Sequence, residues 1–210
     1  MATPAGSKTA DGFEQQFGVN HLAHFVLTAE LLPALIHSST PSFNSRVVVV
    51  SSSGHRYSPV HLDDVNLSKA YDPNVGYGNS KTATIWMANY IDRFYGPRGV
   101  HATALHPGGI FTGLFRNVPT EMLAEWQKDS AMMASMLSPE QGAATSIWAA
   151  GAKVLEGKGG MYLCNCSVGG PAKDMTSILD PGYAPHAFDE EGENKLWELS
   201  SKLAGIKVEI

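Results

Sequence analysis

A tyrosine and a lysine four residues apart are the side chains of this sequence best suited to chemistry. Tyr77 and Lys81 delimit the segment Tyr77-Gly78-Asn79-Ser80-Lys81, and three consecutive serines, residues 51–53, precede it. On a helix this spacing places both side chains on one face, where the ammonium favours the phenolate and lowers the pKa of the phenol from about 10. A serine hydroxyl could then hold the substrate oxygen that receives the proton. The pattern predicts an acid–base catalyst.

Two long helices and a run of valines must position these side chains. Apolar residues recur at helical spacing from residue 11 to about residue 35, and a second long helix over residues 76–95 carries the tyrosine and the lysine. Val47 to Val50 form a short, wholly apolar, β-branched run, which predicts a strand buried on both faces of a parallel sheet. The serines follow this strand, and open α/β sheets bind ligands beyond the carboxyl ends of their strands.

The rest of the sequence continues an alternation of strands and helices. We expect strands at residues 100–106 and Met161–Cys164, two short helical pieces within 117–137, and helices at 138–152 and 194–203. This order predicts an α/β fold in one domain, residues 1–210, with a parallel sheet of about three strands flanked by helices. The valine strand forms one edge of that sheet, and such an edge has to be covered or paired. We therefore expect the N-terminal segment or another subunit on it.

Composition excludes several classes of function. The net charge of −5 gives no electrostatic reason to expect nucleic acid or an anionic membrane as a partner. The N-terminus lacks the pattern of a secretory signal, and no apolar run approaches the length of a membrane span. Cys164 and Cys166 have no second pair to complete a metal site, so no metal is predicted. These features predict a soluble, cytoplasmic protein.

Together these segments resemble the short-chain dehydrogenase/reductase family, especially its retinol-dehydrogenase-like branch. Residues 11–25 are similar to that branch's fourth helix, residues 46–55 to its fifth strand, and residues 105–112 to its sixth strand and following turn. A YxxxK motif alone is a weak signal, but here it stands in register with the serine strand and the asparagine helix. The resemblance covers nearly the whole chain and implies a Rossmann-like fold.

The resemblance also implies a role for each residue of the site. Tyr77 is the proton donor or acceptor, and Lys81 lowers its pKa and holds the cofactor ribose. Ser52, the second serine after the strand, orients the substrate carbonyl. Asn20 holds a water molecule that links Lys81 to solvent.

The family's phosphate-binding segment has no counterpart in the sequence. Its first strand, its TGxxxGxG turn and the following helix are absent, as are the ribose selector and the Asn-Asn-Ala-Gly strand. Only vestigial cofactor contacts are implied, by the Pro107-Gly108 turn and Thr112 at the nicotinamide end. We therefore expect an N-terminally truncated Rossmann-like fold, with no cofactor bound.

Three functions are compatible with this combination. The first is acid–base chemistry without hydride transfer, as an isomerase, epimerase, dehydratase or cyclase acting on a small apolar carbonyl compound. The second is an NAD(P)-dependent oxidoreductase whose cofactor half is missing or supplied by another polypeptide. The third is a non-catalytic binding protein. We favour the first, because the acid–base residues are present and the phosphate-binding turn is not.

A few further residues are auxiliary candidates. His55 and His106 follow strand ends, where each is a candidate acid or base, although a local hydrogen-bonding role is the commoner one. Met132 and Met133 belong to a methionine-rich segment that we expect to cover an apolar substrate. We expect a homodimer, either through helices 11–35 and 76–95, as the resemblance implies, or through the exposed strand 47–50.

Overall fold

Strands form where β-branched and apolar runs are bounded by glycine, proline or serine, and helices fill the intervals. The structure, a computed structural model, describes residues 1–177 and 179–207. The strands are β1 (Ser45–Val50), β2 (Val100–His106), β3 (Gly109–Ile110), β4 (Met136–Leu137), β5 (Met161–Cys164) and β6 (Ser167–Val168). The helices are α1 (Gln15–Phe17), α2 (Ala23–Ser38), α3 (Pro73–Tyr95), α4 (Thr120–Lys128), α5 (Ser130–Ser135), α6 (Pro139–Gly151) and α7 (Glu190–Ala204).

The main sheet has the strand order β1-β2-β5-β6. β1, β2 and β5 are parallel, with Val48 opposite Thr103 and Thr103 opposite Met161, and the short β6 pairs antiparallel with β5. The predicted α/β class and the three parallel strands are therefore confirmed. The prediction that the valine strand forms an edge of the sheet is also confirmed, because β1 pairs only with β2 within the described residues.

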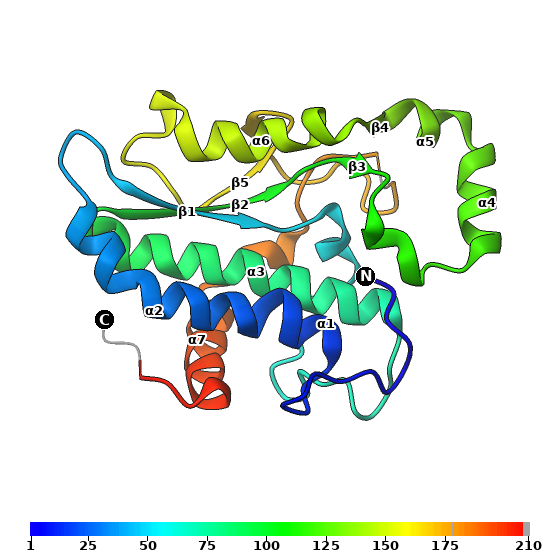
Figure 1. Cartoon of the computed structure of the whole chain (residues 1–210), viewed down its shortest axis with the longest axis horizontal. Coiled ribbons are helices and arrows are strands. Elements are labelled where there is room, and N and C mark those ends of the chain that lie inside the picture. Colours follow the sequence, from blue (N-terminus) through cyan, green and yellow to red (C-terminus); the bar gives the residue numbers. More distant parts are fainter. Residues whose placement is uncertain (178, 208–210) are drawn as a thin grey trace.

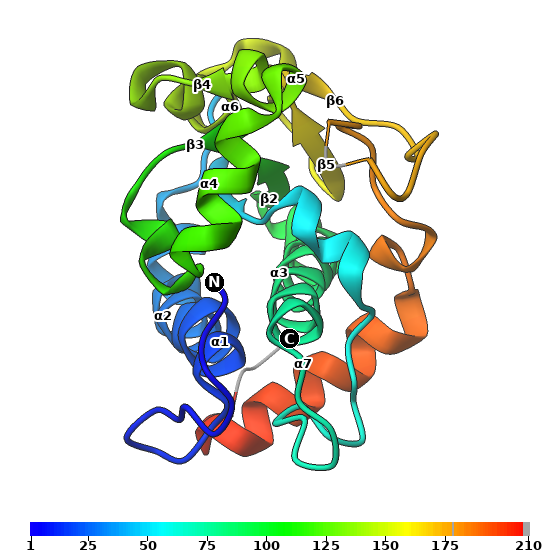
Figure 2. The ribbon, with the colours of Figure 1, turned by 90° about the vertical axis from the view of Figure 1, so that its right-hand side faces the viewer.

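Helices cover both faces of this sheet in layers. α6 lies on one face, α2 and α3 lie on the other, and α7 packs beneath α3 (Figures 1 and 2). The larger core cluster lies between α3 and the sheet and includes Ile85, Ile91 and Tyr95, together with Trp197 of α7. A smaller cluster under α6 includes Leu105 and Leu163.

α3 is the central helix and carries the predicted catalytic pair. It begins at Pro73 because the Asp72 side chain accepts hydrogen bonds from the backbone N–H groups of Asn74 and Val75. Residues 76–80 and 82–91 are all buried, because the sheet, the residues before α2, and α7 surround the helix. Little of helix 76–95 is therefore left to form the predicted subunit interface.

The segment leading into α2 contains a π-helical turn, Gly18–Leu22, that joins α1 to α2. Gln15–Ser38 is long and apolar enough, with a mean hydropathy of 1.4, to cross a membrane on length and composition alone. The expectation that no segment approaches that length was wrong. The segment nevertheless packs as part of the fold, since His21 is fully buried against Ser200 of α7 and Phe25 lies in the core.

β1 is less buried than its apolar sequence predicts. Only Val49 of the four valines is fully buried, and Val50 is 47% exposed. The reason is its edge position, because no described strand covers the side of β1 that faces away from β2.

The methionine-rich segment forms an excursion beyond the carboxyl end of the sheet (Figure 1). β3 and β4 pair in parallel and hold the two ends of the excursion together. Between them lie a short 3-10 helix, Gly113–Asn117, and the helices α4 and α5. The two short helical pieces predicted within residues 117–137 are thus present.

Candidate active site at the carboxyl end of the first strand

Ser52 and Tyr77 meet at the carboxyl end of β1, at a tight contact that a glycine permits. Ser52 caps the 3-10 helix Ser53–Tyr57, its Oγ accepting a hydrogen bond from the backbone N–H of Gly54 at 3.0 Å. The ring of Tyr77 packs on Gly54 so closely that a Cβ at this glycine would lie 2.6 Å from Cε1 of the tyrosine. The structure therefore brings together the serine and the tyrosine that the sequence pairs.

The pKa of Tyr77 is raised above 10, contrary to the sequence-based expectation. Burial is the largest cause, since it disfavours the phenolate, and the interaction with the Ser52 hydroxyl opposes it only in part. Lys81 does not act on the phenol as predicted. Its Nζ lies 5.8 Å from the centroid of the Tyr77 ring and donates a 2.9 Å hydrogen bond to the carbonyl oxygen of Val50.

Lys81 is itself perturbed. Burial lowers the pKa of its amino group from 10.5 to about 8, so that a substantial part of it is neutral in mildly alkaline solution. The side chain lines a groove of about 330 Å³ that runs along the outer edge of β1 between that strand and α2. Lys81 thus links the tyrosine to an open edge of the sheet.

Asn20 lies within the π-helical turn and is held against α3. Its Nδ2 donates to Ser80 Oγ at 3.0 Å, and that hydroxyl donates to the backbone carbonyl of Tyr77 at 2.8 Å. Asn20 and Lys81 line the same groove, so the structure does place the asparagine beside the lysine. π-Helical turns are frequent at functional sites. The water-holding role of Asn20 stays a prediction.

Both histidines near the strand ends are bound to the backbone. His55 is fully buried, its Nδ1 donating to Ser52 O at 2.6 Å while its Nε2 accepts from the Ala184 N–H at 2.9 Å. His106 Nδ1 accepts from the Ser53 N–H at 3.1 Å. Burial lowers the pKa of each from 6.5 to about 4, so both are neutral near pH 7. This geometry favours the local hydrogen-bonding role, in which the two rings fix the serine turn.

Arg56 and a distant loop also hold this turn, and neither was predicted from the sequence. Arg56 donates through Nε to Ser53 O and through Nη2 to Ser177 O, and its Nη1 lies 3.8 Å from the carboxylate of Asp180. His186 Nε2 donates to His55 O at 2.9 Å. The contacts with Ser177, Asp180 and His186 join residues more than 120 positions apart, which no local pattern can reveal.

The predicted nicotinamide contacts and the methionines lie on or next to the excursion. Gly108 has a φ of 95°, which favours glycine at the turn after Pro107, and Thr112 is exposed and caps the 3-10 helix Gly113–Asn117. Met132 is buried, whereas Met133 is 37% exposed. Pro107 and Gly108 directly follow His106, whose ring contacts the serine turn, whereas Thr112 and the methionines belong to the excursion.

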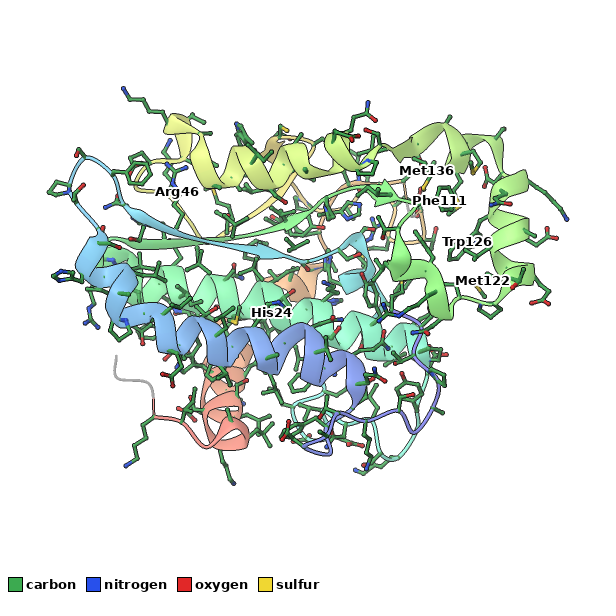
Figure 3. All side chains as sticks on the ribbon, in the orientation of Figure 1. His24, Arg46, Phe111, Met122, Trp126 and Met136 are labelled. Atoms are coloured by element: carbon green, nitrogen blue, oxygen red, sulfur yellow. The ribbon has the colours of Figure 1, made fainter. Side chains whose placement is uncertain are left out.

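An aromatic group on the excursion was missed by the sequence analysis. The rings of Phe111 and Phe115 have centroids 5.5 Å apart, and Trp126 meets Phe115 edge-on at 5.9 Å. Figure 3 shows Phe111, Trp126, Met122 and Met136 distributed around the bend of this segment. The sequence signal that could have revealed this group is the clustering of large apolar side chains in an otherwise polar segment.

The chain's own helix N-termini do not suit a pyrophosphate. Within residues 1–177 and 179–207, a carboxylate caps α1, α3, α5 and α7, namely Glu14, Asp72, Asp129 and Asp189. α4 and α6 each carry a glutamate in the first turn, and α2 continues from the π-helical turn. A helix N-terminus attracts phosphate through its free N–H groups and its positive potential. The capping carboxylates accept hydrogen bonds from these N–H groups, and all of these acids reduce the positive potential.

Known proteins resemble the chain over most of its length. No family model matches it. The short-chain dehydrogenase/reductase prx1 of Penicillium roqueforti is 50% identical over 206 residues, which is 98% of this chain and 60% of that protein. Retinol dehydrogenase 14 of Homo sapiens is 36% identical over 199 residues, 95% of this chain and 54% of that protein. The chain thus spans between half and two thirds of the length of these relatives.

Solved structures share the fold. An uncharacterized protein from Mycobacterium paratuberculosis superposes with a TM-score of 0.68 at 27% identity, over all of this chain and 65% of that one. RhlG of Pseudomonas aeruginosa in a complex with NADP gives a TM-score of 0.56 at 20% identity, over 78% of this chain and 60% of that one.

These findings correct two predictions. The relatives are named dehydrogenases and reductases, which are redox enzymes, so acid–base chemistry without hydride transfer was the wrong choice among the three functions. The expectation that no cofactor takes part was wrong for the same reason, because such reactions require a nicotinamide or an equivalent acceptor. Both errors came from giving more weight to the absent glycine turn than to the residues that are present.

Proposed function

The chain belongs to the short-chain dehydrogenase/reductase family, and we propose that it forms the catalytic half of an NAD(P)-dependent oxidoreductase acting on an apolar alcohol or carbonyl compound. The observation that carries this proposal is the meeting of Ser52 and Tyr77 at the carboxyl end of β1, with Lys81 one helical turn away on α3. That is the end of a parallel sheet at which α/β proteins bind ligands.

The chain's own residues handle the proton and the orientation of the substrate. Ser52 holds the substrate oxygen, and Tyr77 donates a proton to it in reduction or accepts one in oxidation. Burial keeps the Tyr77 phenol protonated near neutral pH, which suits the donating role. A bound nicotinamide supplies or takes the hydride.

The substrate class rests on the excursion and on the names of relatives. Phe111, Phe115 and Trp126 form an aromatic group beyond the carboxyl end of the sheet, near which the methionines gather. Relatives include a retinol dehydrogenase and a polyprenol dehydrogenase, whose names specify long apolar alcohols. We propose that the excursion covers an apolar substrate of this kind.

Turnover by a joined polypeptide tests the function. The chain is fused to the part of the Penicillium roqueforti relative that lies outside the aligned 206 residues. The oxidation of NADPH by this fusion protein is then measured with apolar aldehydes as substrates. We expect turnover that Tyr77→Phe lowers by about 10²- to 10⁴-fold, the usual effect of losing a positioned acid. Phe43→Leu changes an exposed side chain at the opposite end of β1; it is the control and leaves the rate unchanged. Equal rates for the parent and Tyr77→Phe would overturn the assignment.

A further inference from the structure

A cavity of about 580 Å³ opens beside the second half of α2, between that helix, the end of α3 and the C-terminal segment. Its floor is the outer side of the larger core cluster. Leu32 there is only 3% exposed, the Tyr95 ring is fully buried, and Ile36 packs against the same cluster. Ala29 and Pro33 of α2 add apolar surface. The volume is that of cavities that hold small organic molecules.

The rim of this cavity is basic. Arg98, Lys207 and His37 line it, and all three side chains are exposed. The Arg98 guanidinium lies 5.6 Å from the centroid of the Tyr95 ring, a contact that holds this charge over the cavity. Within the part of the chain that the structure describes, no aspartate or glutamate lines the cavity. Positive charge is therefore concentrated here on a chain whose net charge is −5.

Helix ends explain only part of this arrangement. Basic side chains near a helix C-terminus balance the negative end of the helix dipole, which suits His37 at the end of α2. Lys207 comes from a different segment, beyond the end of α7. Dipole balance also gives no reason for an open apolar floor beneath the charges. The combination of floor and rim points to a ligand with an apolar body and an anionic end.

We propose that this cavity binds the anion of a free fatty acid. The alkyl chain lies on Leu32, Ile36 and the Tyr95 ring, and the carboxylate meets Arg98 and Lys207 at the rim. A guanidinium binds a carboxylate through two parallel hydrogen bonds, and a lysine adds a second, more flexible cation. Burial of the alkyl chain supplies the larger part of the affinity, and the two cations select the charged head group.

The cavity is distinct from the candidate active site. Arg98 directly precedes β2, and the lining residues of α2 precede β1, so the cavity lies toward the amino ends of these strands. Ser52 and Tyr77 meet at the carboxyl end of β1 instead. The fatty acid is therefore a ligand of the fold and not the substrate. Its binding joins α2, α3 and the C-terminal segment, and a ligand that binds only the folded state stabilises it.

Calorimetric titration of the 210-residue chain with monomeric hexanoate, octanoate and decanoate tests the proposal. We expect the affinity to rise by up to about fourfold for each methylene group that enters the cavity. Decanol should bind roughly tenfold more weakly than decanoate, because it lacks the charge that the rim recognises. No turnover is involved, so the result is independent of the proposed function.

Variants of the rim test the recognition of the carboxylate. Arg98→Gln and Lys207→Gln should each weaken decanoate binding by about threefold, the usual effect of one exposed ion pair, and leave decanol binding unchanged. Arg98→Lys keeps the charge and should restore part of the affinity. Lys202→Gln changes an exposed lysine of α7 outside the cavity and is the matched control.

A variant of the floor tests the position of the alkyl chain. Ala29→Phe places a ring in the cavity, and we expect it to abolish the binding of both decanoate and decanol. Ala34→Phe adds the same ring to an exposed position of α2 outside the cavity, and it should bind decanoate like the parent.

Three results would overturn the proposal. Equal affinities of the parent for decanoate and decanol would show that the rim recognises no anion. Undiminished decanoate binding in Ala29→Phe would place the ligand elsewhere. Binding to vesicles that contain phosphatidylglycerol, without any binding of monomeric decanoate, would assign the basic rim to a lipid surface.

Discussion

Lys81 is the residue whose environment differs most from its usual state in water. Its amino group contacts a backbone carbonyl and a tyrosine ring, and burial brings its pKa down to about 8. The lysine therefore acts here as a partly neutral amine at the sheet edge. Tyr77 is also controlled mainly by burial, which raises its pKa, so burial disfavours the charged form of both groups.

The lowered pKa of Lys81 predicts a specific dependence of stability on pH. The folded state releases the proton near pH 8 and the unfolded state near pH 10.5, so between these values the unfolded state binds more protons. The free energy of unfolding should therefore rise from pH 8 to pH 10.5 relative to that of Lys81→Met. Urea denaturation across this range measures the difference. Exposed Lys158→Met is the control, and parallel curves for the parent and Lys81→Met would contradict the account.

Sequence alone predicted which residues would form the candidate site, but not how they are connected. Ser52, Tyr77, Lys81 and Asn20 follow from spacing and from resemblance, and the structure gathers them at the end of β1. The bond from Lys81 to Val50 O and the reversed shift of Tyr77 depend on burial by segments far away in the chain. Local spacing contains no information about either.

At the scale of elements, the crossing of α3 with the 3-10 helix Ser53–Tyr57 sets the distance between the tyrosine and the serine. Gly78 lies at this crossing, where an added Cβ would be 2.6 Å from Ser58 N and 3.0 Å from Tyr57 Cβ. A backbone atom cannot give way as a flexible side chain can. The crossing therefore requires glycine.

Gly78→Ala should consequently separate the two elements. We expect a loss of about 1–3 kcal/mol in the free energy of unfolding, the usual cost of forcing a methyl group into a packed contact. Gly151→Ala in α6 is the matched control, because nothing lies within 4 Å of its Cβ and the change should stay within about 0.5 kcal/mol. Thermal unfolding measures both, and equal effects would show that the crossing is looser than described.

The elements were largely predictable, for identifiable reasons. Strands at 100–106 and 161–164 were placed within the observed bounds, because β-branched or apolar runs there end at proline or follow glycine. α7 was expected to begin at residue 194 but begins at Glu190, since its acidic first turn is capped by Asp189 and lacks apolar periodicity. The π-helical turn at Gly18–Leu22 could not be predicted from the local sequence. Its residues Asn20 and His21 bond to α3 and α7, which are far away in the chain.

For the whole molecule, two buried histidines and the partly buried His106 predict sensitivity to acid. Burial lowers the pKa of His21 to about 3 and those of His55 and His106 to about 4, against 6.5 in the unfolded chain. Between pH 6.5 and pH 4 the unfolded state binds more protons, so stability is complete above this window and is lost as the pH falls through it. Each histidine contributes roughly 1 kcal/mol per pH unit.

Urea midpoints at pH 7.0, 5.5 and 4.5 measure this loss. His106→Asn retains an acceptor for the Ser53 N–H and removes one titrating group, so its stability should fall less steeply with acid. His37→Asn changes an exposed histidine and should follow the parent. An unchanged slope in His106→Asn would contradict the assignment of His106 as a partly buried, neutral acceptor.

The central claim is that these residues serve hydride transfer. The most direct measurement uses NADPH carrying deuterium at the transferred position, an apolar aldehyde, and the chain joined to the remainder of the Penicillium roqueforti relative. The account predicts an alcohol that contains one deuterium, formed in equal amount to the NADP⁺ produced and suppressed by Tyr77→Phe. An isomerised or dehydrated product without deuterium, formed while NADPH remains unchanged, would contradict it.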